Sequence, residues 1–288
     1  DNYIQSLFNR GIDGIDYIDG DLIIDWKIAG YQSVESQIVY TDIGNEEHSM
    51  RVDRSATKSI LPSFKPGSPI RYKTGYLPVE NAIDTFYAEE TERTINLRLV
   101  NDVELDGSLY AAYSLPGDAS SQSTAGNVMS NLWSGVFAGT AASSGAWYRT
   151  ANGSGIPHHF QFDLGVTTQL SRYRLWQRGT VSEHNLLYAN GNLKKWEIWG
   201  ATSPAQDGSY DGWTKLLDCE SIKPSEFPVG QNEPEDIAYA AEGEEFIFSE
   251  STPEVRYIRI KVLQTWGNTD YMFAGEIRFW GTKWEVEQ

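Results

Sequence analysis

Three loop-like segments in the second half of the chain place aromatic rings beside arginine, histidine and asparagine side chains. Aromatic faces stack on the C–H-rich faces of sugar rings, and a few polar groups orient the hydroxyls. The planar fork of an arginine suits vicinal hydroxyls or a uronate carboxylate. These residue types therefore indicate carbohydrate binding, and the candidate residues are Trp147, Arg178, His184, Tyr188, Trp266, Asn268 and Tyr271.

Each candidate also has a purely structural interpretation. A loop tryptophan such as Trp147 often covers the core of a sandwich, and Tyr188 could cap a hydrophobic edge. His184 is typical of a surface histidine. Trp266 lies at an expected strand end beside a Gly-Asn pair, so we expect its ring to be exposed.

Catalytic chemistry is harder to build from this sequence. Cys219 has no evident histidine partner, and the acidic segment around it would raise its pKa. His158 and His159 are adjacent on an expected strand, where neighbours face opposite ways, so they do not favour one metal ion. No Gly-x-Ser-x-Gly elbow, phosphate-binding loop or His-Glu-x-x-His motif appears, and nothing selects a glycosidase carboxylate pair. The sequence favours a non-enzymatic binding protein that needs no organic cofactor.

The composition excludes several classes of partner. The chain has 288 residues and a formal net charge of −17, which argues against nucleic acid and anionic membranes as partners. Residues 201–250 hold 12 Asp and Glu against 2 Lys, and we interpret them as a solvated acidic loop. Cys219 is the single cysteine, so no intrachain disulfide can form, and no segment is apolar enough to span a membrane.

Short alternating segments predict an all-β fold. Nine of the ten tryptophans lie in the last 156 residues, mostly in or beside such segments. Because successive strand residues face opposite sides, one set of apolar residues should form the core: Phe160, Phe162, Leu164, Trp196, Ile198, Ile258, Ile260, Val262, Ile277 and Phe279. The opposite, wetter face should carry four arginines: Arg172, Arg174, Arg259 and Arg278.

Residues 1–102 resemble a fibronectin type III domain. Residues 60–74 contain an apolar residue, the turn Pro66-Gly67 and the strand-borne Tyr72, as at the corner between two strands of that family. Trp26 matches the core tryptophan of the family. The resemblance implies a β-sandwich that serves as a spacer, followed by a charged junction and a boundary near residue 103.

Residues 103–288 resemble the discoidin, or coagulation factor 5/8 type C, domains. Four segments in the family's order carry the resemblance: residues 158–165 (HHFQFDLG), 193–200 (LKKWEIWG), 255–260 (VRYIRI) and 274–281 (AGEIRFWG). The resemblance implies a jelly-roll sandwich of the galactose-binding-like fold whose ligand meets loops at one end. Together with the N-terminal module, it is similar to surface lipoproteins with which gut bacteria capture glycans.

Many discoidin-like sugar binders hold a structural calcium ion, which raises the question of such an ion here. Glu276 matches the glutamate that opens the last strand in those domains. Ser134 stands where the family has an aspartate, so only carbonyls and Thr140 remain as further ligands. We therefore favour the absence of calcium over its presence.

These observations predict a non-catalytic protein, secreted or at the cell surface, that binds an oligo- or polysaccharide through its C-terminal domain. The resemblance further implies a lipid anchor attached through a removed N-terminal segment. One alternative is a structural or protein-interaction module of a surface complex, in which the loop aromatics form a protein contact. A second alternative is a glycosidase with an unrecognised carboxylate pair, and lipid binding fits the acidic charge poorly.

Overall fold

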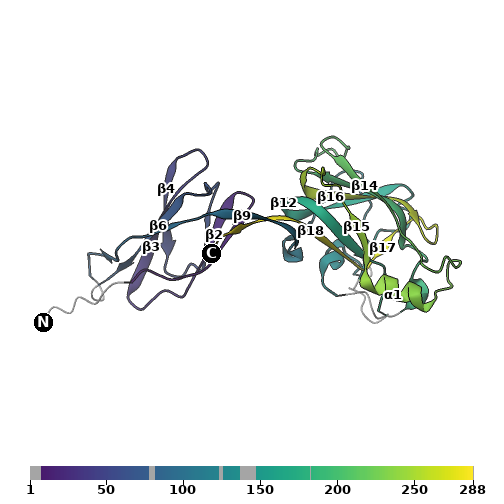
Figure 1. Ribbon diagram of the computed structural model, residues 1–288, viewed down its shortest axis with the longest axis horizontal. Coiled ribbons are helices and arrows are strands. Elements are labelled where there is room, and N and C mark those ends of the chain that lie inside the picture. Colours follow the sequence, from purple (N-terminus) through teal and green to yellow (C-terminus); the bar gives the residue numbers. More distant parts are fainter. Residues whose placement is uncertain (1–7, 78–81, 123–125, 137–146, 182, 288) are drawn as a thin grey trace. The chain divides into compact units, whose positions relative to one another are not determined.

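The structure, a computed structural model, describes residues 8–77, 82–122, 126–136, 147–181 and 183–287. The described residues form β-sheets and a single α-helix, α1 (Pro234–Glu242), so the all-β prediction is confirmed. The chain divides into two compact units, Asp1–Val100 with Lys283–Gln288 and Asn101–Thr282 (Figure 1). The discoidin resemblance places the C-terminal residues in the second module, whereas Lys283–Gln288 cluster with the first unit.

The first unit contains two antiparallel sheets. β1 (Ile12–Ile18), β2 (Asp21–Trp26) and β5 (Lys58–Leu61) form one sheet. The other contains β3 (Ser33–Thr41), β4 (Glu47–Asp53), β6 (Pro69–Tyr76), β7 (Phe86–Tyr87) and β8 (Thr91–Thr94).

Alternation along the strands builds the core of the first unit. Leu22, Ile24 and Trp26 of β2 are buried, while the residues between them are only partly buried. They pack with Ile38 of β3 and Ile70 of β6, so the core draws on both sheets. The indole of Trp26 donates to the Ser59 hydroxyl at 2.8 Å, which satisfies its buried N–H.

The second unit is a sandwich in which one long strand contributes to both layers. β12 (His158–Trp176) pairs through its first half with β16 (Glu254–Thr265) and β10 (Ala111–Ala112). β13 (Leu193–Ala201) and β14 (Thr214–Glu220) extend that layer beyond β16. The second half of β12 pairs with β18 (Glu276–Val286) and β15 (Glu244–Ile247), and β9 (Leu97–Glu104) lies beside β18.

Gly165 allows β12 to pass from one layer to the other. The ladder with β16 shifts register between Asp163 and Thr168, and Gly165 has φ +75° at this irregularity. A Cβ atom added to Gly165 would lie 2.5 Å from the Leu109 carbonyl oxygen. The bend therefore needs a residue without a side chain.

The predicted core faces of the second unit are confirmed. All ten predicted apolar residues belong to one buried cluster, including Phe160 and Phe162 of β12 and Ile258 and Ile260 of β16. The rings of Tyr173, Phe246 and Phe279 stack within it. The alternation pattern located this core because its members lie on regular strands.

Arg259 is an exception to the predicted wet face, because its side chain is fully buried. Residues of the loop between β13 and β14 cover it: the rings of Tyr210 and Trp213 lie 4.7 and 4.4 Å from its guanidinium carbon. Its nitrogens donate to Gln161 Oε1 at 2.7 Å and to the Ser209 carbonyl at 2.9 Å. The prediction was wrong because the covering loop comes from a distant part of the chain.

The acidic segment 201–250 is also more ordered than predicted. It contains β14, α1 and β15 as well as loops. The helix begins with a capping box between Glu233 and Asp236 and ends at Gly243. Asp236 is buried and also accepts hydrogen bonds from the amide and hydroxyl of Ser225. Several of the acidic residues thus organise the segment instead of facing solvent.

Candidate functional site

Three loops of the second unit meet in a region that we call the tip, made of residues 147–157, the described residues of 177–192 (177–181 and 183–192) and residues 266–275. β11 (Tyr148–Arg149) pairs with β17 (Phe273–Ala274), which joins the first loop to the third. The Gly153 amide also donates to the carboxylate of Asp270 at 2.9 Å. Loops far apart in sequence are therefore held side by side.

Asn192 fastens the middle loop to its neighbours. Its side-chain oxygen accepts from the Arg178 amide at 3.0 Å, and its Nδ2 donates to the carbonyls of Arg178 and Leu186 at 3.0 and 2.8 Å. Its own carbonyl accepts from the Trp266 amide at 2.8 Å, and its backbone bridges to Phe273. This fully buried side chain defines the backbone position of Arg178.

Arg178 lies on aromatic rings. Its guanidinium carbon is 3.9 Å from the centre of the Trp147 ring and 5.2 Å from that of Phe273. The Glu183 carboxylate is 3.5 Å from one of its nitrogens. Burial lowers the pKa of Arg178, while the Glu183 carboxylate raises it and the positive charge of Arg149 lowers it. The arginine is therefore a partly desolvated cation with one acidic neighbour.

Two other rings of the tip carry cations in the same way. The guanidinium carbon of Arg149 lies 3.9 Å from the centre of the Tyr271 ring. Lys194 Nζ lies 4.7 Å from the centre of the Trp266 ring. Cation–π contacts of this kind hold charged side chains over aromatic faces.

The structure brings Arg178, Trp147 and Tyr271 into one aromatic and cationic group, although the Trp147 ring is only 7% exposed. Trp266, whose ring the sequence predicts to be exposed, is half-buried instead, because it packs in a second group with Tyr188, whose ring centre is 5.4 Å away. Backbone hydrogen bonds of the middle loop join these two groups, since the Gly191 carbonyl accepts from the Phe273 amide and the Asn192 carbonyl from the Trp266 amide.

Tyr188 must be reassigned, because its side chain is fully buried. Its hydroxyl donates to the Asp236 carbonyl at 3.1 Å, so it packs the tip from within. His184 is half-buried with Nδ1 3.0 Å from the Gly179 carbonyl oxygen. Asn268 is exposed, and its Oδ1 accepts from Gln264 at 3.1 Å. His184 and Asn268 stay candidates for ligand contact.

The sequence analysis did not select Arg149 or Lys194. Arg149 directly follows the Trp147-Tyr148 pair, and Lys194 is the second residue of β13, the strand after the middle loop. Their roles depend on contacts with Tyr271 and Trp266, which are distant in sequence. In the sequence, the signal that could have pointed to these two residues is their position as basic residues beside loop aromatics.

The expected calcium site is a polar cavity of about 270 Å³ around Glu276, which is 2% exposed. The carboxylate accepts from the Gly135 amide at 3.2 Å, and Arg278 Nε lies 3.4 Å away. Burial raises the pKa of Glu276 to about 7. Calcium requires several oxygen ligands. Glu104, Ser108 and Ser134 also line the cavity, but the Glu276 carboxylate already faces an N–H donor and the Arg278 guanidinium, which disfavours the ion. Thr140 lies outside the described residues.

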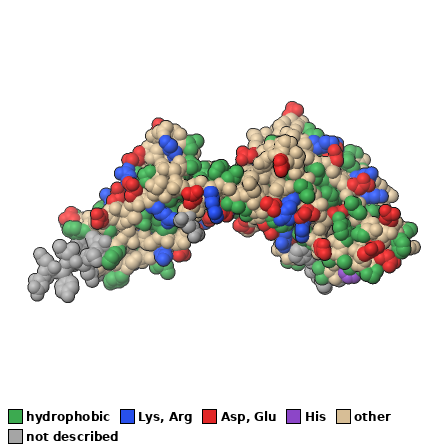
Figure 2. Space-filling view, viewed as in Figure 1, with side chains coloured by type: hydrophobic (Ala, Val, Ile, Leu, Met, Phe, Trp, Pro, Cys, Tyr) green, Lys and Arg blue, Asp and Glu red, His purple; other side chains and the backbone are tan. Residues whose placement is uncertain are grey.

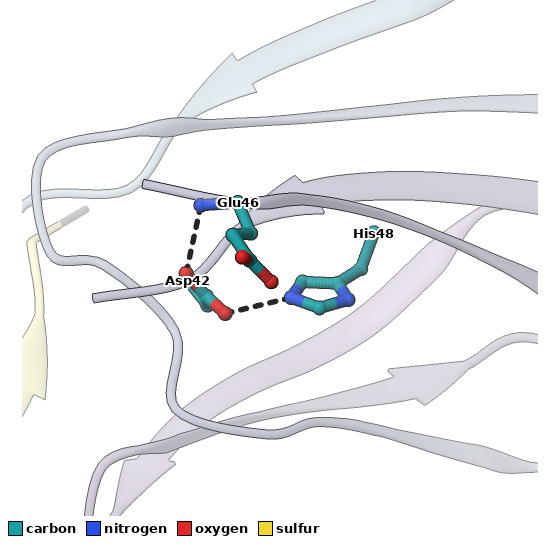
Figure 3. A group of neighbouring side chains, drawn as sticks. All are labelled: Asp42, Glu46 and His48. Atoms are coloured by element: carbon teal, nitrogen blue, oxygen red, sulfur yellow. Dashed lines mark hydrogen bonds and ion pairs between the residues drawn. The ribbon is translucent and has the colours of Figure 1, made fainter. Parts of the chain in front are cut away.

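A separate polar cluster lies on the turn between β3 and β4 (Figure 3). Asp42 accepts from the Glu46 amide at 2.9 Å through one oxygen, and its other oxygen is 2.7 Å from His48 Nε2. The His48 ring stacks on Tyr40 with a centre separation of 5.1 Å. Hydrogen bonds from His48 and the turn lower the pKa of the Asp42 carboxyl. The cluster shapes the hairpin and lies in the first unit, apart from the tip.

Cys219 is buried, and its sulfur is 3.0 Å from the Tyr173 hydroxyl. Burial raises the pKa of its thiol to about 12, so the thiolate is not populated near neutral pH. Over the part of the chain that the structure describes, no helix has the length and apolar character needed to cross a bilayer.

Two families of unknown function match the chain. DUF5000, described as a domain of unknown function, matches residues 133–281. DUF4998, with the same description, matches residues 1–86. A comparison with curated proteins gives no match.

Solved structures with a similar fold include the SusE-like protein BT2857. It is 36% identical, with a TM-score of 0.58, and the match covers 62% of this chain and all of that one. A putative chitobiase fragment from Bacteroides thetaiotaomicron is 16% identical over 63% of this chain and 93% of the fragment, with a TM-score of 0.42. The module CBM32-2 of a GH31 protein, solved with GalNAc, is 12% identical over 65% and 98%, with a TM-score of 0.34. The discoidin assignment stays a prediction.

Proposed function

The chain belongs to the DUF5000 family, and from this premise we propose that it is a non-catalytic glycan-binding protein of the bacterial cell surface. The proposed site is the tip, with Arg178, Arg149 and Tyr271 as contact residues and with Trp266 and Asn268 at its margin. In this proposal the first unit is a spacer and the second is the binding domain.

The observation that carries the proposal is the convergence of three loops around Arg178. A buried asparagine holds the arginine backbone, and a tryptophan ring supports its guanidinium. Sites that recognise hydroxyl and carboxylate groups need such polar groups in fixed orientations. Half-buried and exposed residues, Tyr271 and Asn268, extend the surface beside it.

The relative with 36% identity supports the cellular context. Its name, SusE-like, agrees with the resemblance of the sequence to surface proteins that capture glycans. A surface position also agrees with the single cysteine, since a protein of this size has cores that need no disulfides.

Isothermal titration against plant, mucin and host glycans tests the proposal, with Arg178→Gln as the diagnostic variant. We expect weak binding by the native protein, because a shallow site buries few groups, and about a tenfold loss in the variant. Lys215→Gln, which removes a charge on β14 in the same unit, is the control. No binding across the panel, or equal binding by the Arg178→Gln and Lys215→Gln variants, would contradict a glycan site at the tip.

Assays for released reducing ends on every glycan that binds address the glycosidase alternative. We expect no release above the background of a heat-denatured sample. Turnover that is lost on replacement of a single Asp or Glu would instead show an enzyme.

A specific observation favours a protein contact on the first unit as a second candidate function. Ile28, Tyr31 and Ile83 are 97%, 89% and 99% exposed. The turn before β3 and the end of β6 are joined by a hydrogen bond from the Leu77 amide to the Gln32 carbonyl. Exposed apolar residues gathered at one end of a domain are typical of interaction surfaces.

A pull-down from the source cell envelope tests this candidate. We expect a specific partner that is retained by the native protein and lost when Tyr31 and Ile83 are replaced by serine. The Arg178→Gln variant should retain that partner, because its substitution lies in the other unit. Identical retention by all three proteins would remove this candidate.

A further inference from the structure

The sequence predicts aromatic rings at the tip whose faces stack on sugars, but cationic side chains lie over these rings. Trp147 carries Arg178, and Tyr271 carries Arg149, each at 3.9 Å from ring centre to guanidinium carbon. Trp266 carries Lys194 Nζ at 4.7 Å. At least one face of each ring is therefore used to position a positive charge, and the polar groups of the tip become its main chemical feature.

The two guanidinium groups have hydrogen-bond donors to spare. A guanidinium has five N–H donors. The Nε atoms of Arg149 and Arg178 are buried and have no hydrogen-bond acceptor among the described residues. Arg149 uses one terminal nitrogen for the Asn152 side chain, and the other known partner of Arg178 is the Glu183 carboxylate at 3.5 Å. The contacts of the described residues therefore leave N–H donors of both guanidinium groups without an acceptor.

Two arginines of the tip lie close together although the net charge of the molecule is strongly negative. The formal net charge is −17, and Figure 2 shows acidic side chains interspersed with lysines and arginines on the visible face of both units. Arg149 nevertheless lies over the ring of Tyr271 and Arg178 over the rings of Trp147 and Phe273. These three rings pack in one cluster, so the two guanidinium groups are neighbours. Keeping two like charges together has an electrostatic cost, which an anionic group between them would relieve.

We infer that the glycan recognised at the tip carries a carboxylate, as uronic and sialic acids do, and that Arg149 and Arg178 bind it. Arginine recognises carboxylates through two parallel N–H···O hydrogen bonds. The ring contacts hold both guanidinium groups in place, so little side-chain entropy is lost on binding. The inference rests on the proposed glycan-binding function and specifies the class of glycan.

Matched pairs of acidic and neutral glycans measure how much the carboxylate contributes to affinity. Isothermal titration compares trigalacturonic acid with its methyl ester, and sialyllactose with lactose. Charge-assisted hydrogen bonds are stronger than neutral ones, so at least one acid should bind about tenfold or more tightly than its neutral counterpart. The affinity for that acid should also fall as ionic strength rises, because salt screens the attraction. The two pairs distinguish a uronate from a sialate.

Two substitutions should lower the preference for acidic glycans, a third should raise it, and a control should leave it unchanged. Arg149→Gln and Arg178→Gln should each reduce the ratio of acidic to neutral affinity by about tenfold, while Lys215→Gln, a charge control on β14, should leave the ratio unchanged. Glu183→Gln removes the competing carboxylate of Arg178, and we expect acids to bind about two- to fivefold more tightly. Thermal unfolding of each variant confirms that it is folded.

Each outcome bears on the inference. Neutral glycans that bind as tightly as their acidic partners overturn it and leave the proposed glycan-binding function intact. Binding to no glycan, acidic or neutral, overturns both. An acid preference that survives in the Arg149→Gln and Arg178→Gln variants also overturns the inference, because other residues would then bind the carboxylate.

Discussion

Asn192 shows how much of the tip depends on a single buried amide. Its side chain makes hydrogen bonds to the amide and carbonyl of Arg178 and to the Leu186 carbonyl. All of these are backbone groups of the middle loop, and the asparagine lies at its end. The residue therefore positions Arg178 without needing to contact a ligand.

Replacing Asn192 by alanine should destabilise the second unit by about 2–4 kcal/mol, since buried backbone groups lose their partners. Glycan binding at the tip should weaken as well. Urea unfolding and titration with the best ligand measure the two effects. Asn185→Ala, at an exposed position of the same loop, is the matched control and should change stability by less than about 0.5 kcal/mol. Equal effects of the two substitutions would contradict the positioning role.

Glu276 makes stability depend on pH in an unusual direction. Burial raises the pKa of its carboxyl from 4.5 to about 7, so the folded protein holds this proton more tightly than the unfolded chain. The stabilisation is complete below the unfolded value and is lost as pH rises through the folded value. Glu244, whose pKa burial also raises to about 7, acts in the same sense.

Between about pH 4.5 and pH 7.5, the native protein should lose roughly 3 kcal/mol of unfolding free energy relative to Glu276→Gln. Urea unfolding across this range measures the difference. Glu254→Gln, at an exposed position, should follow the native curve. A native curve parallel to that of Glu276→Gln would show that this proton does not contribute.

Chelators should leave the melting temperature unchanged, and added calcium should not raise it. The Glu276 carboxylate already accepts from the Gly135 amide and lies beside the Arg278 guanidinium, so a calcium ion would have to displace both contacts to use it as a ligand. Differential scanning fluorimetry with EDTA and with calcium measures both. A clear increase in melting temperature with calcium would show that the ion binds in this cavity.

Among the elements, β12 depends most on a single conformation. Its bend at Gly165 lets one strand complete the ladders with β16 and with β18. The adjacent Asp163 supports the bend, since its side chain accepts from the Gly165 amide at 2.7 Å and from Arg256. The Asp-Leu-Gly segment is therefore a structural corner.

Gly165→Ala should destabilise the second unit by about 2–4 kcal/mol, because it combines a positive φ with a contact against the Leu109 carbonyl. Gly107→Ala, whose added Cβ would meet Trp133 at an ordinary distance of 3.6 Å, should have a much smaller effect. Thermal unfolding of both variants gives the comparison. Similar melting temperatures for the two would show that the corner tolerates a side chain.

At the scale of the whole molecule, the two units have separate cores. The buried cluster of the first unit includes Leu22, and that of the second includes Ile258, with no residue in common. β18 contributes residues to both units, because Lys283–Gln288 cluster with the first and the earlier residues with the second.

Calorimetry should resolve two unfolding transitions, one for each core. Leu22→Ala and Ile258→Ala should each cost about 2–5 kcal/mol and should lower the temperature of different transitions. A single transition that both substitutions shift equally would show that the units unfold together.

The amino-acid sequence by itself determined the fold class, the regular strands of the second core and the faces that they bury. Alternation is a local property, so Phe160, Phe162, Ile258 and Ile260 could be assigned to the core from their spacing. The same logic failed for Arg259, because the rings that bury it come from a loop outside its own strand.

Only the tertiary structure decided what the tip presents. The sequence supplied Trp147, Arg178 and Tyr271 as candidates, but it could not show that cations cover the rings or that Tyr188 is buried. Side chains in loops are oriented by contacts with segments far away along the chain, and no local periodicity encodes those contacts.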